Sequence, residues 1–227
     1  MCGRFVQSQD PAAYARLFGA EVVVTESLEP SYNVAPTDRV YAVAEHDGVR
    51  RLGTFRWGLI PFWAEDRKIA SRHINARAET VDTKPAFRDS FASRRCIVPA
   101  DGFYEWERRD DGSKLPHYLH PTDAEAFALA GLWASWRDPE TDERVVTCTI
   151  LTTEPNEVAG RIHDRMPVVL RPDDWDAWLD RDNGDTDSLR GMLGPAPDGA
   201  VGEHPVSSLV NSVKNNVPEL LQPIDVD

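Results

Sequence analysis

The chain has 227 residues, with 38 acidic and 25 basic side chains and a formal net charge of -13. This length is enough to bury a hydrophobic core in one large domain or two small ones. A hydrophobic content of 41%, with seven Trp, eight Phe and five Tyr, excludes a disordered chain. No apolar run is long enough to span a membrane, and no basic start precedes an apolar stretch. We therefore expect neither a membrane span nor a signal peptide.

The charge is distributed unevenly along the chain. Residues 1–109 carry 16 basic and 15 acidic side chains, whereas residues 110–227 carry 9 and 23. Only four residues are Lys and 23 are Asp, a composition typical of proteins in concentrated salt, where ions screen charge repulsion. An ordinary acidic protein is the alternative. The whole-chain charge argues against a nucleic-acid partner, because phosphate binding depends on Lys and Arg.

The predicted elements combine many strands with a few short helices. In chain order they are a helix over 10–19, strands over 40–45 and 49–57, helices over 75–81 and 85–92, two strands within 96–106, strands over 116–120, 126–133 and 145–153, a helix over 155–162, a strand over 166–170, a helix over 172–179 and a loop-rich stretch over 183–202. No alternation of strand and helix recurs. The predicted fold class is α+β, a single domain over 1–227 with a mostly antiparallel, barrel-like β-sheet core and peripheral short helices.

The second residue, Cys2, is the first candidate for chemistry. Removal of Met1 is expected because residue 2 is small, and it would leave an α-amine and a thiol on adjacent carbons. With a pKa of roughly 8, the α-amine is partly neutral at neutral pH and can attack an aldehyde to form a Schiff base. The thiol can then close on the imine carbon, and this forms a five-membered thiazolidine ring. A buried cysteine without function is the alternative.

Two further stretches carry polar groups that are unusual for a core. Glu105 lies between two large aromatic residues, so burial would raise its pKa and suit it to acid–base catalysis. If it points outward it is an ordinary surface carboxylate, and the strand alternation does not decide between the two. His163 has an acidic and a basic neighbour, which indicates a proton-transfer or phosphate-binding role, or a salt-bridged turn.

Neither a metal site nor a nucleotide cofactor is expected. Three cysteines are too few for a disulfide scaffold and indicate a reducing cytoplasm, and Cys96 and Cys148 lie in apolar strand patterns typical of buried thiols. His117 and His120 are three residues apart in a predicted strand and so face opposite sides. The sequence has no Cys-x-x-Cys pair and no glycine-rich phosphate loop.

Seven short motifs follow one another along the chain. They are Met-Cys-Gly-Arg-Phe at 1–5, Tyr-Asn-Val-Ala-Pro-Thr at 32–37, Trp-Gly-Leu-Ile-Pro-Phe-Trp at 57–63, Ile-Asn-Ala-Arg-Ala-Glu-Thr at 74–80, Gly-Phe-Tyr-Glu-Trp at 102–106, Ile-His-Asp-Arg-Met-Pro-Val at 162–168 and His-Pro-Val-Ser at 204–207. Each motif alone is weak, but the ordered set resembles the SOS-response-associated peptidase (SRAP) family. The resemblance covers about residues 1–223.

This resemblance implies a sensor of abasic sites in single-stranded DNA that crosslinks to the ring-opened deoxyribose and protects the lesion during replication. By resemblance, Cys2 is the crosslinking nucleophile and Asn75 positions the α-amine. Glu105 shuttles protons, and His163 lies near the sugar and its 3′ phosphate, with a part in crosslink reversal or strand scission. The residues that the resemblance assigns to DNA contacts are Arg4, Asn33, Trp63, Arg77, Thr152 and Arg165. The loop 84–87 falls on a wedge that interrupts base stacking, and the basic stretch 67–109 is where the DNA groove is expected.

Other functions remain open at this level. An N-terminal-nucleophile hydrolase or amidotransferase would attack an amide with the Cys2 thiolate, and a peptidase could act on its own Met1. A non-covalent reader of modified bases would use Arg4, Arg77 and Arg165 but not Cys2. For the leading hypothesis we expect a cytoplasmic monomer that associates with the nucleoid on DNA and needs no cofactor.

Overall fold

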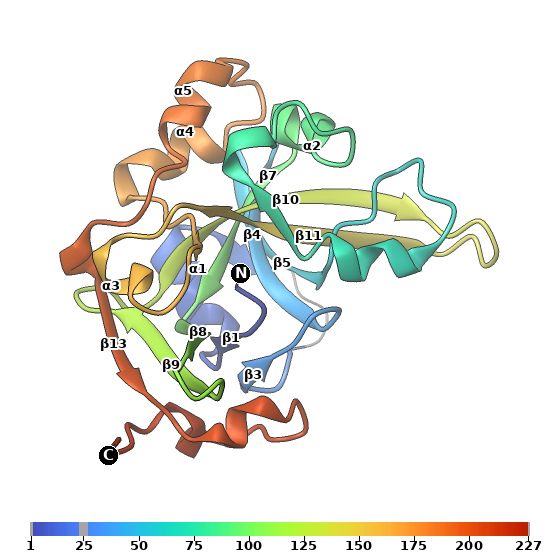
Figure 1. Ribbon diagram of the computed structural model, residues 1–227. Helices are drawn as coiled ribbons and strands as arrows, with labels where there is room; N and C mark the ends of the chain where they lie inside the picture. The colour runs from blue at the N-terminus through green and yellow to red at the C-terminus, as the bar shows by residue number, and fades with distance from the viewer. Residues whose placement is uncertain (1, 23–26, 227) are drawn as a thin grey trace.

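The strands of the protein form two sheets, which lie against each other in a computed structural model that describes residues 2–22 and 27–226 (Figure 1). Sheet A has the spatial order β13 (Val201–Pro205), β9 (Lys114–Pro121), β8 (Gly102–Arg108), β1 (Phe5–Gln7) and β3 (Ser31–Val34). Sheet B has the order β12 (Met166–Pro167), β11 (Arg144–Thr153), β10 (Phe127–Arg137), β7 (Arg95–Ala100), β4 (Arg39–His46), β5 (Val49–Trp57) and β2 (Glu21–Val22), with β6 (Asn75–Arg77) beside β11. The expected removal of Met1 concerns a residue outside these ranges.

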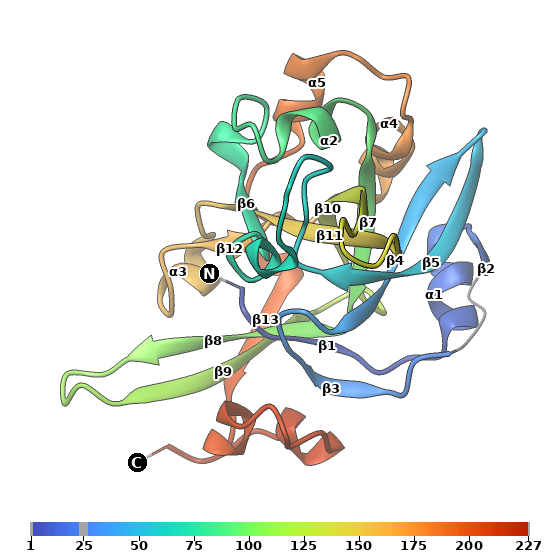
Figure 2. The ribbon, with the colours of Figure 1, turned by 90° about the vertical axis from the view of Figure 1, so that its right-hand side faces the viewer.

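Sheet B curls into a barrel. Strands β5 and β11 pair in parallel, and this pairing closes the antiparallel run β5–β4–β7–β10–β11 on itself. Sheet A is antiparallel throughout, and its β8–β9 hairpin extends away from the barrel (Figure 2). The predicted α+β class, with a mostly antiparallel and barrel-like sheet core, is confirmed.

The helices are short and lie on the outside of the sheets. They are the α-helices α1 (Pro11–Phe18), α2 (Arg88–Ser93), α3 (Glu157–Gly160), α4 (Trp175–Leu179) and α5 (Thr186–Gly191), and the 3-10 helices η1 (Arg67–Arg72), η2 (Ala78–Thr80), η3 (Pro172–Asp174), η4 (Asp198–Ala200), η5 (Ser208–Asn211) and η6 (Pro218–Leu221). α2, α4 and α5 gather at the end of the molecule shown at the top of Figure 1. No helix in the described part of the chain is both long enough and apolar enough to cross a membrane.

The helix expected over 10–19 and the strands expected over 40–45 and 49–57 are confirmed, and local contacts show why they end where they do. The Asp10 side chain accepts a hydrogen bond from the Ala12 backbone N–H at the start of α1, and Gly19 ends the helix in a left-handed conformation with φ 60°. The turn between β4 and β5 holds Asp47 and Gly48 at φ 53° and 71°, as a two-residue hairpin turn requires.

Three local predictions differ from the structure, the first of them because a long-range contact overrides the local pattern. The helix expected over 75–81 is β6 followed by η2, since Asn75–Arg77 pairs in parallel with β11. The strand expected over 166–170 is limited to Met166–Pro167, with one further bridge from Val169 to Leu129. The stretch 183–202, expected to be loop-rich, contains α5, whose first turn is capped by the Asp185 side chain.

Strand β1 is short, and it directly follows the segment that contains Cys2. It lies between β8 and β3, and all three of its residues are buried. The buried Gln7 side chain donates to the backbone oxygens of Tyr41 and Pro99 at 2.9 and 2.7 Å and accepts from the Tyr41 N–H at 2.8 Å. The Phe5 ring packs edge-on against Trp57 at 4.9 Å. These contacts tie β1 to the barrel.

Residues 206–224, called the C-terminal segment below, cover one face of sheet A. Val206, Val210 and Leu220 of this segment are fully buried against Val6 and Tyr104. Figures 1 and 2 both show the segment beneath β3 and β9. Sheet A is therefore covered on both sides, by the barrel and by the C-terminal segment.

Candidate functional site

Cys2 lies in the interior of the protein, three residues before the start of β1. Its side chain is fully buried, and the Asn75 side-chain amide donates to the Cys2 backbone oxygen at 2.7 Å. Burial raises the pKa of the Cys2 thiol well above its ordinary value, and the negative charge of Glu105 raises it further. The thiol is therefore held protonated, and Cys2, Asn75 and Glu105 meet at one place although they come from distant parts of the sequence.

Glu105 points inward, which the sequence pattern did not decide. It is only 4% exposed, on β8 two residues beyond the Phe103 that pairs with Phe5. β8 and β9 approach closely here because Gly102 has no side chain, and a Cβ there would lie 2.4 Å from the Tyr118 ring. Burial raises the pKa of Glu105, and the charge of nearby His163 opposes part of this effect.

His163 lies in the loop between α3 and β12. Its Nδ1 accepts the backbone N–H of Arg165 at 3.0 Å, and the Asp164 carboxylate lies 2.9 Å from the same nitrogen. The two residues that follow His163 therefore both contact the same ring nitrogen. These contacts hold the His163 ring within its own loop, and its predicted role stays a prediction.

Glu105 and His163 line one cavity of about 490 Å³. Its seven lining residues are Glu105, Trp106, Arg108, Lys114, Ile162, His163 and Asp164. Arg108 and Lys114 were not identified from the sequence, where they fall at the two ends of a polar turn. The signal that could have found them is their basic charge a few residues from Glu105 along a predicted hairpin.

Two of the arginines predicted to contact DNA lie beside β11, and they differ in exposure and in ion pairing. Arg77 is exposed on β6, in register with the buried Thr152 of β11. Arg165 is only 13% exposed, and its guanidinium contacts both carboxylate oxygens of Glu79 at 2.5 and 3.0 Å and the Thr152 backbone oxygen at 2.5 Å. The hydrogen bond from Arg165 lowers the pKa of Glu79. Arg165 is therefore already paired within the protein.

Arg4 and Asn33 form a second paired group, against the C-terminal segment. The Arg4 guanidinium donates to the Asn33 side-chain oxygen at 2.7 Å and to the Val210 backbone oxygen at 2.9 Å. The Asn33 side-chain nitrogen lies 3.0 and 2.8 Å from the backbone oxygens of Ser212 and Asn215. Burial lowers the pKa of Arg4. The structure places Arg4 and Asn33 where they hold the C-terminal segment, and their predicted DNA contacts stay predictions.

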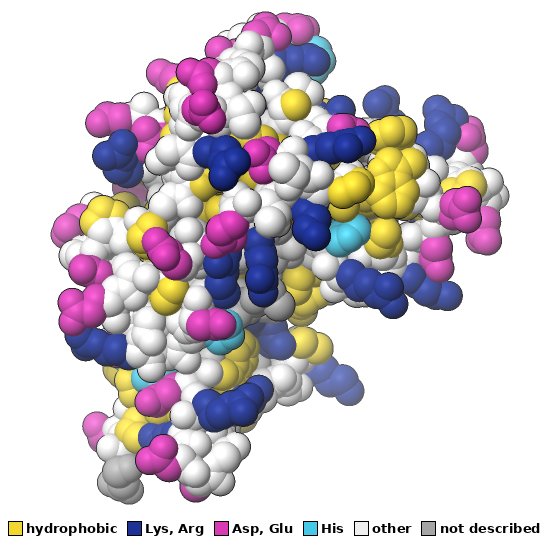
Figure 3. All heavy atoms as spheres, turned by 45° about the horizontal axis from the view of Figure 1, so that its top comes forward, with side chains coloured by type: hydrophobic (Ala, Val, Ile, Leu, Met, Phe, Trp, Pro, Cys, Tyr) yellow, Lys and Arg dark blue, Asp and Glu magenta, His cyan; other side chains and the backbone are white. Residues whose placement is uncertain are grey.

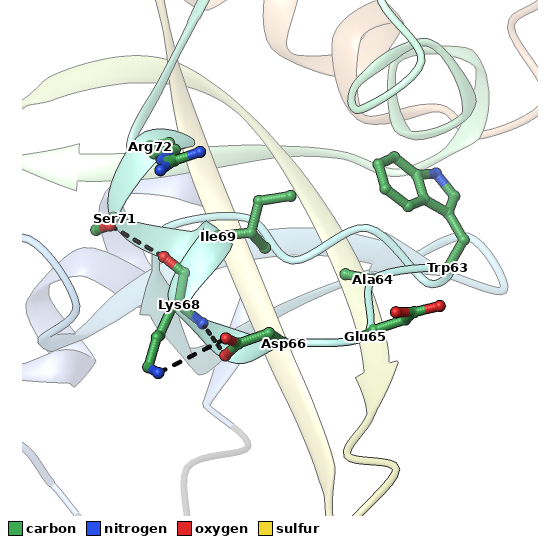
Figure 4. Close-up of a pocket in the computed structure, with 8 residues that line it drawn as sticks. All are labelled: Trp63, Ala64, Glu65, Asp66, Lys68, Ile69, Ser71 and Arg72. Atoms are coloured by element: carbon green, nitrogen blue, oxygen red, sulfur yellow. Dashed lines mark hydrogen bonds and ion pairs between the residues drawn. The ribbon is translucent and has the colours of Figure 1, made fainter.

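Trp63 lies apart from Cys2, on an exposed loop. Its side chain is 49% exposed and the neighbouring Phe62 is 65% exposed. Figure 4 shows the Trp63 indole at the edge of a hollow of about 630 Å³, whose other lining residues include Lys68 and Arg72. The hollow thus has an exposed indole on one side and two basic side chains on the other, and the DNA contact predicted for Trp63 stays a prediction. The expected wedge loop, 84–87, leads from η2 into α2.

Basic side chains cross the middle of one face of the molecule. Figure 3 shows Lys and Arg there, whereas many Asp and Glu side chains gather toward the upper and left edges of that view. The acidic net charge is therefore not spread evenly over the surface. In residues 2–22 and 27–226 no group of three or more His, Cys, Asp and Glu side chains is placed to hold a metal ion.

Comparisons with known proteins identify the family of the chain. A model of the SOS response associated peptidase (SRAP) family matches residues 1–213. The chain is 45% identical over 223 residues to the abasic site processing protein YoqW of Bacillus subtilis, covering 98% of this chain and 99% of that protein. It is 32% identical over 228 residues to the abasic site processing protein HMCES of Gallus gallus, covering 87% and 67%.

Among solved structures, a protein from Bacteroides thetaiotaomicron has the same fold. The TM-score is 0.89 at 28% sequence identity, with 98% of this chain and 100% of that chain covered. The class of protein is thus an α+β domain with a barrel and a buried cysteine near its amino terminus. The chain belongs to the SOS response associated peptidase family.

Proposed function

We propose that this protein senses abasic sites in single-stranded DNA and bonds to them covalently through Cys2. The observation that carries the proposal is the meeting of Cys2, Asn75 and Glu105 at one buried place beside the His163 cavity. Relatives that match nearly the whole chain are called abasic site processing proteins, and this supports the same partner. Because that partner is chromosomal DNA, we place the protein in the cytoplasm, at the nucleoid when bound.

The proposed reaction begins with the amine. Removal of Met1 frees the Cys2 α-amine, and the Asn75 Oδ1, a buried atom without a hydrogen-bond partner in the described chain, is available to accept from it. The amine attacks the aldehyde carbon of the ring-opened deoxyribose, and one water leaves as the Schiff base forms. Glu105 donates the proton that the departing oxygen needs, since its raised pKa keeps it protonated closer to neutral pH than an ordinary carboxylate.

The thiol completes the product. Sulfur bonds to the imine carbon, the thiol proton passes to the nitrogen, and a thiazolidine ring results. Over both steps one aldehyde, one amine and one thiol become the ring and one water. His163, which lines the same cavity as Glu105, would contact the sugar or its 3′ phosphate and take part in reversal or strand scission.

The raised pKa of the Cys2 thiol favours this sequence over an amidohydrolase. A cysteine that attacks an amide as its first step works as a thiolate and is activated by a lowered pKa. In the proposed reaction the thiol adds second, after the amine has already captured the aldehyde. The peptidase character of the family is then limited, in this proposal, to removal of Met1.

The test is crosslinking to single-stranded DNA that contains one abasic site, followed by a denaturing gel. The wild-type protein should give a heat-resistant shifted band, and Cys2→Ala should give none. Both Cys2→Ala and Cys2→Ser keep the α-amine and lack the thiol, so each should give a band only when borohydride reduces the Schiff base, and Cys2→Ser is the matched control because its side chain is closest in size to that of Cys. Absence of a band for wild-type protein, with Met1 removal verified by mass spectrometry, would contradict the proposal, and hydrolysis of glutamine would support the amidotransferase instead.

A further inference from the structure

The β8–β9 hairpin carries two basic side chains out of the site. Arg108, the last residue of β8, and Lys114, the first residue of β9, line the cavity that Glu105 and His163 also line. Figure 2 shows the hairpin projecting beyond the rest of sheet A. Arg108 follows Glu105 by three residues, or about 10 Å along an extended strand, so the two side chains leave opposite faces of β8 and the cavity that both line is what connects them. The cavity thus joins the candidate chemical centre to a basic outer end.

The pairing of these two side chains is unfavourable without a ligand. Arg108 and Lys114 are directly opposite each other in the β8–β9 register. Like charges in such a cross-strand pair repel and destabilise the hairpin. Both side chains are exposed, and within residues 2–22 and 27–226 neither forms a hydrogen bond or an ion pair. An anion bound between them would relieve the repulsion.

The neighbouring acidic groups do not neutralise this pair. Glu107 points to the other face of the hairpin, where its carboxylate lies 3.3 Å from His117 Nε2. Asp164 lines the cavity but lies against His163. Asp111, at the tip of the hairpin, accepts the backbone N–H of Ser113 at 2.8 Å. The positive charge of the Arg108 and Lys114 pair is therefore not cancelled by these carboxylates.

Trp106, which lines the same cavity as the two cations, is held by contacts to the rest of the protein. The Trp106 indole N–H donates to the Asn211 side-chain oxygen of the C-terminal segment at 2.7 Å, and the Arg4 guanidinium lies 5.9 Å from the Trp106 ring centre. The base of the hairpin is thus attached to the body of the protein. A ligand that extends from the site along this cavity meets Trp106 and then the two positive charges.

We propose that Arg108 and Lys114 bind backbone phosphates of the DNA strand on one side of the abasic site. This inference rests on the proposed function and adds a direction to it. The DNA on one side of the lesion runs along the β8–β9 hairpin. The DNA on the other side runs away from the hairpin and does not contact Arg108 or Lys114. Binding of both phosphates replaces a repulsive pair of cations by two favourable contacts of opposite charge.

The first test measures affinity without chemistry, using single-stranded DNA with a central tetrahydrofuran in place of the abasic sugar, which has no aldehyde. Each phosphate contact on a single strand contributes about -0.7 to the slope of log affinity against log salt. The double variant Arg108→Gln with Lys114→Gln should therefore lose about 1.4 in the magnitude of this slope. A charge-keeping variant, Arg108→Lys with Lys114→Arg, should retain the wild-type slope.

The matched control removes two exposed arginines elsewhere, Arg16→Gln with Arg181→Gln. Both are exposed without a side-chain ion pair in the described chain, and they lie on α1 and after α4, away from the hairpin (Figure 2). This control should change the slope by much less than the hairpin variant. An unchanged slope in the hairpin variant, or an equal loss in the control, overturns the proposal.

The second test gives the direction. Crosslinking is measured on two oligonucleotides, one with the abasic site near its 5′ end and one with the site near its 3′ end. The hairpin variant should be slower than wild type on one of them and equal to wild type on the other. Equal defects on both would overturn the one-sided path. If wild-type protein crosslinks to neither, the proposed function fails, whereas the affinity test with tetrahydrofuran still decides the hairpin contact.

Discussion

The basic side chains around Cys2 fall into two groups that differ in what they contact. Arg4 and Arg165 are engaged by the protein itself, through Asn33 and the C-terminal segment in one case and through Glu79 in the other. Arg77, Arg108 and Lys114 are exposed and have no ion pair among the described residues. The first group holds parts of the fold together, whereas the second group is available to a phosphate.

The buried centre contrasts with both groups. Glu105 is placed in an environment that raises its pKa, and this environment opposes its charge. Such an arrangement destabilises the fold and suits a proton donor, whereas the Arg165–Glu79 contact stabilises the fold and lowers a carboxyl pKa. The comparison separates residues that the proposed crosslinking reaction would use from residues that stabilise the fold. Four substitutions test this separation.

The largest effect is expected for Glu105→Gln on the rate of crosslinking. Gln cannot donate or accept a proton, and loss of a general acid–base group slows a reaction by about 100-fold or more. Single-turnover crosslinking, followed by quenching and a denaturing gel, gives the rate. Affinity for tetrahydrofuran DNA should stay at the wild-type value. An unchanged crosslinking rate would refute the acid–base role.

The next largest effect is expected for Asn33→Ala on stability. This substitution leaves the backbone oxygens of Ser212 and Asn215 without their donor and removes the acceptor of Arg4. The loss of several partly buried hydrogen bonds should lower the free energy of unfolding by about 2–3 kcal/mol. Urea denaturation measures this loss. An Asn33→Ala variant of normal stability that binds DNA poorly would instead assign Asn33 to the DNA channel.

Arg165→Gln and Arg77→Gln should separate architecture from phosphate binding. Arg165→Gln removes the partner of Glu79 and of the Thr152 backbone oxygen, so it should lower the free energy of unfolding by about 1–2 kcal/mol. Arg77→Gln should leave stability unchanged and reduce the salt slope by about 0.7, the share of one phosphate on a single strand. Equal behaviour of the two variants in both measurements would contradict the division into two groups.

The smallest effect is expected for Glu105→Gln on the pH dependence of stability. A carboxyl group whose pKa is raised in the folded protein costs no stability below its unfolded pKa, and the penalty grows between the unfolded and the folded pKa and is complete above the folded pKa. Glu105→Gln should therefore unfold at a higher temperature than wild type at pH 8, and the difference should shrink toward pH 4. Thermal melts across this range measure it. A difference that grows as the pH falls would mean that the pKa is lowered instead.

Much of the candidate site could be predicted because its chemistry depends on residue type and position in the chain. A cysteine at position 2 beside a removable Met is visible in the sequence, and so are the Asp10–Gly19 helix signals and the turn at Asp47 and Gly48. The helix expected over 75–81 was wrong because pairing with β11 stabilises an extended chain there. Local propensity is too weak to overcome such a pairing.

By itself, the sequence determined the α+β class and the family of the protein and suggested the amine–thiol chemistry proposed for Cys2, because these follow from periodicity, motif order and residue chemistry. Only the tertiary structure decided that Glu105 points inward, that Arg4 and Arg165 are paired within the protein, and that Arg108 and Lys114 border the site. Side-chain direction and charge pairing depend on strand register and on contacts between residues far apart in the chain, such as Asn33 with the C-terminal segment. Those contacts exist only once the two sheets have come together.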